Sequence, residues 1–401
     1  MAPDGVAGPV AHLTSMSTEQ HQLAIPTLPI SRMRQAALPL LFILLGVVYA
    51  TWASRIPAVR DALQLDPAQL SLVLLCAGIG AVGSFPLAAW LTGHYGARHG
   101  AWYAGMALLL TMPCLALAPN IGLLMIAMTS LGICSGCFDV AINALGAQAE
   151  KIAGRSTMSL LHAWFCVGTL SGALIGSGMA GMGMSPLSHF GLLALLFALP
   201  LRLCYNALPH DRPEPVAGKK HFSLPHGPLI ALGVIGFCGA IVEGAIADWS
   251  GVYMKDWLQA TDGTAPLAFA AFAAMMLVTR LIGDRLKERF GARKVVSAGA
   301  LTAAVGIFVA LIAAGIPLSI IGFALTGVGV ATVFPFMFSA AGRHGSTALA
   351  GVATLSYGGG LIGPPVIGFL AHGFGLHAAL ALVGVLCLAV ALAASRARWL
   401  E

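Results

Sequence analysis

Long apolar runs without a formal charge alternate with short charged segments along most of the chain. Four such runs contain no Asp, Glu, Lys or Arg, at residues 100–138, 156–201, 295–342 and 344–395. One transmembrane helix needs about 20 apolar residues, so each run is long enough for two helices joined by a turn. Pro and Gly predict those turns at Pro119-Asn120, Gly183 to Pro186, Gly315 to Pro317 and His372-Gly373.

Shorter apolar runs, each of the length of one span, occupy the rest of the sequence at about residues 34–54, 68–93, 228–254 and 265–286. The pattern therefore predicts twelve transmembrane helices, and the fold class is an all-α membrane protein. Composition agrees, because 58% of the 401 residues are hydrophobic and only 9% are charged, against roughly 25% charged in soluble domains. We expect the lipid bilayer to surround most of the chain.

A polar, Pro-containing stretch at residues 208–227 divides the predicted helices into two sets of six. The sequence thus predicts an N-terminal bundle at 34–207, a linker at 208–227 and a C-terminal bundle at 228–396. A flexible cytoplasmic N-terminal tail is expected at 1–33 and a cytoplasmic C-terminus at 397–401.

The two halves also resemble one another in sequence. Gly168-x-x-x-Gly172 matches Gly359-x-x-x-Gly363, and Leu131-Gly132 before Asp139 matches Thr326-Gly327 before Phe334. Glycines four residues apart let helix backbones approach closely in a bilayer, so a packing role is the simpler interpretation. Repeats of half a chain are common in transporters, which bind their solute between the repeats.

The distribution of Lys and Arg predicts the orientation. Most lie on the side of the chain ends and the linker; only Arg55, Arg60 and Lys255 fall on the other side, and Arg280 falls within a span. Because positive charge near span ends is retained in the cytoplasm, we expect a multi-pass inner-membrane protein with both termini cytoplasmic. This topology accounts for the net charge of +6, and no nucleic-acid partner is needed to explain it.

Carboxylates within the spans are candidates for transport chemistry, because an ionisable group at mid-membrane costs ~2.5 to 3.5 kcal/mol and needs a compensating reason. Asp139 and Asn143 share one face of the fourth span and could bind a polar solute, a proton or both; a structural Asp is the alternative. Glu243 lies deep in the seventh span, and Asp248 lies nearer its outer end. Burial disfavours a charged carboxyl, so these groups are candidates for proton coupling, with a buried ion pair as the alternative.

Aromatic and imidazole side chains complete the candidate solute site. Trp249 shares a face with Tyr253, and either a solute-stacking role or a place in the aromatic belt at the membrane interface fits equally. His162, Trp52 and Tyr357 are further candidates, each balanced against packing. We expect neither a metal nor a cofactor, and no enzymatic activity, because no nucleophile has an obvious base and Cys134-x-x-Cys137 has no second ligand pair.

The eighth span carries Arg280 and Asp284 one turn apart, and this spacing predicts that they pair with each other at the cytoplasmic end, with direct contact to the solute as the alternative. The segment Asp284-Arg-Leu-Lys-Glu288-Arg289-Phe-Gly291-Ala-Arg293-Lys294 resembles the signature loop of the major facilitator superfamily, over a chain that resembles this superfamily throughout. The resemblance implies a cytoplasmic gate formed by Arg280, Asp284, Glu288, Arg289, Gly291 and Arg293. The first-half counterpart departs from it, with Gly93 and His94 in place of an acid and a base.

Three shorter segments resemble the YbjJ/MosC-like branch of that superfamily, which is related to the fucose permeases. They are Trp52-Ala-Ser-Arg55-Ile-Pro57, Asp139-Val-Ala-Ile-Asn143 and Glu243-Gly-Ala-Ile-Ala-Asp248-Trp249. The resemblance implies proton-linked movement of a small polar organic solute, with sugars and polyols as a candidate class. Fucose permeases use an acid and an Asn in the fourth span, as here, but their Asp in the first span is replaced by Ser54-Arg55.

The sequence as a whole predicts a monomeric secondary transporter that works by alternating access and couples a small solute to a proton gradient. Two alternatives stay open. The first is proton-driven efflux of a small organic compound by antiport, and the second is a membrane sensor that binds a ligand without moving it.

Overall fold

The structure is a computed structural model, and it describes residues 32–153, 157–208, 227, 229–313, 315–397 and 400. These residues form fourteen helices: α1 (Arg32–Ala62), α2 (Pro67–Gly83), α3 (Phe85–Tyr95), α4 (Ala97–Leu117), α5 (Ile121–Ala153), α6 (Met158–Gly181), α7 (Pro186–Ala207), α8 (Leu229–Asp256), α9 (Leu267–Phe290), α10 (Ala292–Ile312), α11 (Ile316–Val330), α12 (Val333–Gly342), α13 (Ser346–Phe374) and α14 (Leu376–Arg396).

Two pairs of these helices are broken spans. Helices α2 and α3 meet at Ser84 with a bend of 40°, and α11 and α12 together form one apolar segment long enough to cross a membrane. With each pair counted once, the described residues contain the twelve predicted spans. The last predicted turn was placed two residues early: α13 continues to Phe374 and the chain reverses at Gly375, whose φ of 83° suits glycine.

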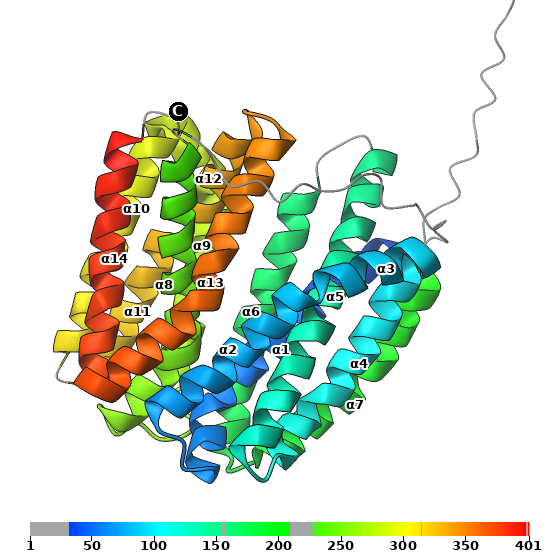
Figure 1. Cartoon of the computed structure of the whole chain (residues 1–401), viewed down its shortest axis with the longest axis horizontal. Coiled ribbons are helices and arrows are strands. Elements are labelled where there is room, and N and C mark those ends of the chain that lie inside the picture. The colour runs from blue at the N-terminus through cyan, green and yellow to red at the C-terminus, as the bar shows by residue number, and fades with distance from the viewer. Residues whose placement is uncertain are drawn as a thin grey trace, which may run out of the picture.

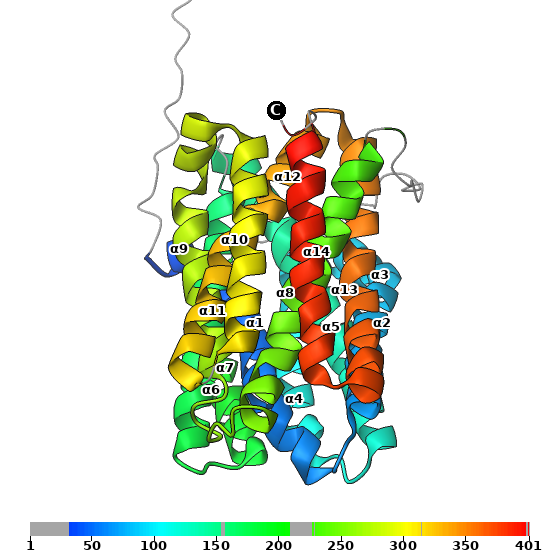
Figure 2. The ribbon, with the colours of Figure 1, turned by 90° about the vertical axis from the view of Figure 1, so that its left-hand side faces the viewer.

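The helices form two bundles that lie side by side, α1 to α7 in one and α8 to α14 in the other (Figure 1). Helices α10 and α14 cover the outer side of the second bundle (Figure 2). We call the membrane side where α1 begins and α14 ends the terminal face, and the side where α1 and α8 end the distal face. The bundles converge at the distal face and spread apart toward the terminal face (Figure 1). The predicted linker and N-terminal tail lie almost entirely outside the described residues.

Equivalent helices pack in the same way in the two halves, at the predicted glycines. A Cβ atom added to Gly168 on α6 would lie 2.2 Å from the Ile43 carbonyl oxygen of α1. The matching Gly359 on α13 would place a Cβ 2.1 Å from the Phe237 carbonyl oxygen of α8. These distances leave no room for a side chain, so the fifth span of each half contacts the first span backbone to backbone.

The second sequence match has the same structural meaning. A Cβ on Gly132 of α5 would lie 2.0 Å from the Ala77 carbonyl oxygen of α2, and one on Gly327 of α11 would lie 2.2 Å from that of Phe272 of α9. The fourth span of each half thus packs on the second at a glycine. The predicted packing role of these glycines and the two-bundle pseudo-repeat are confirmed.

Candidate functional site

An ion pair lies at mid-span between the two bundles. Arg280 of α9 places its Nη2 atom 3.4 Å from Glu243 Oε1 of α8. The guanidinium also donates to the Cys166 thiol of α6 at 3.0 Å and to the Ala331 carbonyl oxygen at 3.3 Å. The two charged side chains are 22% and 26% exposed, so solvent reaches them. Because Cys166 belongs to the other half, Arg280 touches both bundles.

The predicted pairing of Arg280 with Asp284 is therefore wrong. Asp284 lies one turn closer to the terminal face, where its side chain is exposed. The long arginine side chain instead turns toward α8, where Glu243 would otherwise be a carboxylate without a cation in the membrane interior. Sequence spacing could suggest only the local partner, because the neighbouring helix is chosen by the fold.

A cavity of about 70 Å³ surrounds this pair. It is lined from the first bundle by Tyr49, Phe165, Cys166 and Thr169, and from the second by Glu243, Ala247, Phe269, Phe272, Ala273, Met276 and Arg280. Glu243 and Arg280 are the one acid and the one base of this lining. The volume accommodates a few water molecules. The rings of Tyr49 and Phe269 meet edge to face at 6.4 Å and join α1 to α9 beside the pair.

A second polar group lies on α5. Asn143 donates from Nδ2 to the Asp139 carboxylate at 2.9 Å, which confirms that the two side chains share a helix face. Asp139 is exposed although it lies at the middle of its helix. Tyr357 of α13, which is 60% exposed, lies within electrostatic range of Asp139. Since α5 and α13 belong to different bundles, solvent reaches a space between the halves at this depth.

Asp248 and His162 adjoin the same region. Asp248 is half-buried and, like Glu243, lies within electrostatic range of the Tyr49 hydroxyl. His162 is exposed, meets the ring of Phe42 edge to face at 5.5 Å, and lies within range of the Arg280 charge. The structure thus brings both residues close to the ion pair.

The two candidate tryptophans lie elsewhere. Trp249 is 0% exposed and Trp52 is 5% exposed, and neither lines the cavity. Tyr253, which is also fully buried, has its hydroxyl 3.3 Å from the Ala310 carbonyl oxygen. Membrane-interface aromatics face lipid headgroups, so that alternative for Trp249 and Tyr253 is wrong. The reason is that α8 is an inner helix whose distal part is covered on all sides.

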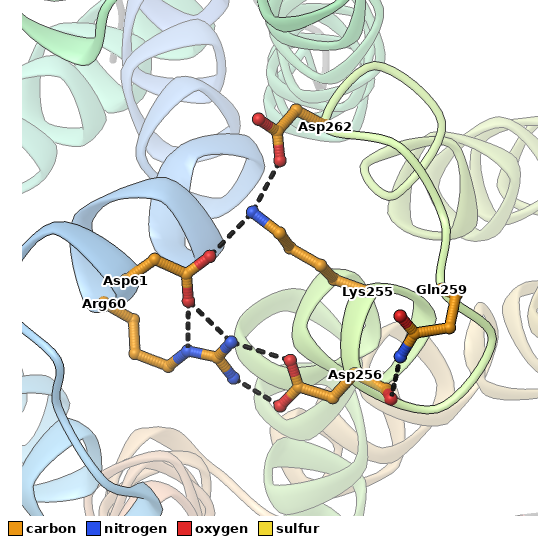
Figure 3. A network of polar contacts seen from close by, with 6 residues as sticks. All are labelled: Arg60, Asp61, Lys255, Asp256, Gln259 and Asp262. Carbon is orange, nitrogen blue, oxygen red and sulfur yellow. Dashed lines mark hydrogen bonds and ion pairs between the residues drawn. The ribbon is translucent and has the colours of Figure 1, made fainter.

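A charged network closes the distal face (Figure 3). Arg60 of α1 holds Asp256 of α8 through two bonds of 2.5 and 2.7 Å, and Lys255 of α8 holds Asp61 of α1 at 2.7 Å. We call these four residues the distal lock. Both pairs connect one bundle to the other. Asp262 adds a bond to Lys255 of 2.6 Å within the second half.

Sequence reasoning missed the distal lock. A charged side chain at the end of a span costs little free energy, so these residues needed no partner to explain their position. The pairs join residues almost two hundred positions apart, so no local spacing reveals them. One signal was available. The first and seventh spans occupy matching places in the repeat, and each ends in a base followed by an acid, Arg60-Asp61 and Lys255-Asp256.

Close packing reinforces this closure. Ser177 of α6 donates a hydrogen bond to the Gly263 carbonyl oxygen of the loop before α9, and a Cβ on Gly263 would lie 2.7 Å from the Gly181 Cα. A Cβ on Gly368 of α13 would likewise lie 2.1 Å from the Ser71 Cβ of α2, so these two helices also leave no room for a side chain. The halves are therefore in direct contact at the distal face on both sides of the lock.

The predicted gate residues lie at the terminal ends of α9 and α10. Asp284, Glu288 and Arg289 are exposed, and Arg293 is half-buried. Gly291 has φ 83° and ψ 147°, which closely match 86° and 160° at Gly96 in the first half. The two loops share a backbone conformation although their charges differ. A role in gating stays a prediction.

No group of three or more His, Cys, Asp and Glu residues that could hold a metal ion occurs within the part of the chain that the structure describes. Among the described residues that line the cavity, the charged groups are the Glu243 carboxylate and the Arg280 guanidinium. A carboxylate and a guanidinium are able to form ion pairs and hydrogen bonds with a polar or charged molecule.

Comparison with known proteins gives a consistent result. Residues 37–256 and 232–401 match the family model described as Major Facilitator Superfamily. An uncharacterized MFS-type transporter of Yersinia pestis is 34% identical over 94% of this chain and 99% of its own length. The membrane protein MosC of Rhizobium meliloti is 28% identical over 89% of this chain and 88% of its own. The structure of a bacterial homolog of the human lysosomal transporter Spinster, inward-facing and occupied, covers 92% of this chain and 97% of its own with a TM-score of 0.76 and 12% identity, which shows the shared fold.

Proposed function

Because this chain belongs to the major facilitator superfamily and is a multi-pass membrane transporter, we propose that it couples a proton to the movement of a small polar organic solute by alternating access. One observation carries the proposal. An acid and a base of opposite charge line a cavity between the two halves at mid-span, where an ion pair unrelated to function is expensive to maintain.

Alternating access requires that one side of the cavity be shut while the other is open. The distal lock and the contacts around Gly263 supply the closed side. Asp139 and Tyr357 belong to different halves, are exposed and lie within electrostatic range of one another, which supports an opening toward the terminal face. The opposite state would form when the bundles rock so that the lock separates and the terminal ends meet.

The positive-inside rule supports an assignment of the two faces. Lys and Arg concentrate at the terminal face, at Arg98, Lys151, Arg202 and the segment 285–294, and such charge is retained in the cytoplasm. The terminal face is then cytoplasmic, both termini are cytoplasmic, and the conformation in hand is open to the inside of the cell. Bacterial relatives favour the inner membrane as the location.

Glu243 is the group that we assign to proton coupling. Its carboxylate has a single contact to Arg280 at 3.4 Å, which is longer than the 2.7 to 2.9 Å of strong charged pairs, and its side chain is reached by solvent. A proton can therefore reach it, and protonation ends the attraction to Arg280. Asp248 lies within electrostatic range of Tyr49, which lines the same cavity. Asp139 with Asn143 provides a donor and an acceptor for the polar groups of a solute.

A flux measurement tests the proposal. The purified chain is reconstituted in proteoliposomes that enclose a pH-sensitive dye, and sugars, polyols, amino acids and organic acids are added in turn. We expect at least one class to carry protons inward, and we expect Glu243→Gln to abolish this signal. Asp262→Asn, which alters an exposed carboxylate outside the cavity and outside the predicted gate, should retain it.

Two results would contradict the proposal. Solute movement that is as strong in Glu243→Gln as in the unaltered protein and still acidifies the lumen would remove Glu243 from coupling. Ligand binding without any flux would favour a sensor. Loading the same vesicles with solute and imposing the gradient in reverse distinguishes uptake from efflux by antiport.

A further inference from the structure

The Arg280 guanidinium has more hydrogen-bonding capacity than its surroundings use. An arginine offers five N–H donors in a planar fork, and its pairs with carboxylates are often bidentate at 2.7 to 2.9 Å. At the distal face Arg60 binds Asp256 in this way, through two bonds of 2.5 and 2.7 Å. Arg280 has one carboxylate contact of 3.4 Å and otherwise donates to a thiol and a carbonyl.

Among the residues that the structure describes, Arg280 is also the one cation of the cavity lining. Tyr49 faces it from α1, and Cys166 and His162 lie near it on α6. Asp248 on α8, which lies within electrostatic range of Tyr49, and Asp139 on α5, which lies within range of Tyr357 on α13, carry negative charge or none. An anionic group that entered the chamber would therefore be attracted to the Arg280 guanidinium and to no other described side chain of the lining.

We propose that the transported solute carries a carboxylate, and that this carboxylate replaces Glu243 as the partner of Arg280. The inference rests on the proposed function of a proton-coupled transporter and specifies its substrate class. The planar guanidinium of arginine matches the two oxygens of a carboxylate. Both halves line the cavity, so a solute bound there would contact both.

The exchange conserves charge at the site. A proton from water binds a Glu243 carboxylate oxygen and forms an O–H bond, which leaves Arg280 without a counter-ion. The solute carboxylate then accepts hydrogen bonds from the two Nη atoms and restores the neutral total. An uncompensated charge is costly in this interior, so the proton and the anion bind together, and the loaded carrier moves no net charge across the membrane.

Carbon-matched pairs of an acid and an alcohol provide the test. The full chain in detergent is heated with gluconate or sorbitol, glycerate or glycerol, and lactate or propane-1,2-diol at pH 5.5 and pH 8. We expect acids to raise the melting temperature, more strongly at pH 5.5, and alcohols to leave it unchanged. Arg280→Gln should weaken acid binding by about 10- to 100-fold, the worth of a charged hydrogen-bonded pair.

Matched variants guard against a folding defect. Arg285→Gln removes an exposed arginine of the same helix and should bind acids normally. Glu243→Gln imitates the protonated carboxyl, so it should bind acids equally at both pH values. The double variant Glu243→Gln with Arg280→Gln leaves no unpaired charge in the cavity, and it should stay folded while losing acid binding.

Flux separates this inference from the function on which it rests. In proteoliposomes, uptake of a stabilising acid should follow the pH gradient and should not change when a potassium diffusion potential is imposed. The carboxylate inference would be overturned if an alcohol both stabilised the protein and was taken up along the gradient, or if no acid of the panel stabilised it. Either result would leave proton-coupled transport standing. A stabilising acid that shows no gradient-driven uptake would instead count against the transport function.

Discussion

The distal lock should set the balance between the two conformations, and Asp256→Asn is the sharpest way to weaken it. The substitution keeps the size of the side chain and removes the charge that Arg60 holds through two bonds. Arg60 would still contact Asp61 at 2.7 Å within its own half. The local structure of α1 should therefore survive, and the loss should fall on the connection between α1 and α8.

The magnitude follows from the exposure of the pair. The Arg60 side chain is 13% exposed and that of Asp256 is 46% exposed. Fully exposed ion pairs contribute about 0.2 to 1 kcal/mol, and a bidentate arginine pair with one partner largely buried lies above that range, at about 1 to 2 kcal/mol. Since about 1.4 kcal/mol is a factor of ten, the population with an open distal face should rise roughly 5- to 30-fold.

Spin labels at Gln64 and Thr261 would report this change, because both residues are exposed at the distal face and belong to different halves. Pulsed dipolar spectroscopy should show a longer-distance component that grows in Asp256→Asn. The control is Asp262→Asn, which breaks the bond to Lys255 within the second half and none of the three bonds of the lock between halves. Equal distance changes in the two variants would refute the reasoning.

Two further substitutions test packing statements. Gly359→Ala places a Cβ 2.1 Å from the Phe237 carbonyl oxygen and should destabilise the fold by about 3 kcal/mol or more. Gly360→Ala is the control: its Cβ would meet no described atom within 4 Å, so the melting temperature should stay close to that of the unaltered protein. Trp249→Phe should leave the apparent affinity for solute unchanged in transport assays, because the indole is fully buried and its Nε1 atom has no hydrogen-bond partner. A large rise in that apparent KM would place Trp249 in the solute site.

Hydropathy was sufficient for the fold because the bilayer fixes the length of each span. The twelve predicted spans are present, and the one misplaced turn shows the limit of the method. His372-Gly373 contains a glycine that a helix tolerates, whereas only Gly375 has the positive φ that the reversal requires. The glycine matches between the halves were equally informative, because a backbone contact such as that at Gly168 permits no other residue.

The partners of charged residues were less predictable. The prediction that Asp139 and Asn143 share a face was correct because both lie on one helix, and helix geometry alone brings them together. Two carboxylates were possible partners for Arg280: Asp284, one turn away on the same helix, and Glu243 on α8. Arg280 pairs with Glu243, which lines the same cavity. Such a preference depends on how α8 and α9 are packed, which a single sequence does not contain.

The position of each ion pair relative to the two halves limits how coupling can work. Glu243 and Arg280 both belong to the second bundle, so a proton on Glu243 changes a contact within one half and leaves the lock between halves intact. The lock lies twelve residues further along α8, about 18 Å at 1.5 Å per residue.

For the lock to respond, the change at Glu243 must alter a contact with the first bundle. The ion pair already contacts that bundle where the Arg280 guanidinium donates to Cys166. A solute bound at Arg280 that also touches α6 would join the bundles near the terminal side of the chamber, and this added attraction would favour closure there and separation of the lock. Proton binding alone provides no such bridge, so a carrier built in this way should reorient when it holds both proton and solute and should resist reorienting with the proton alone.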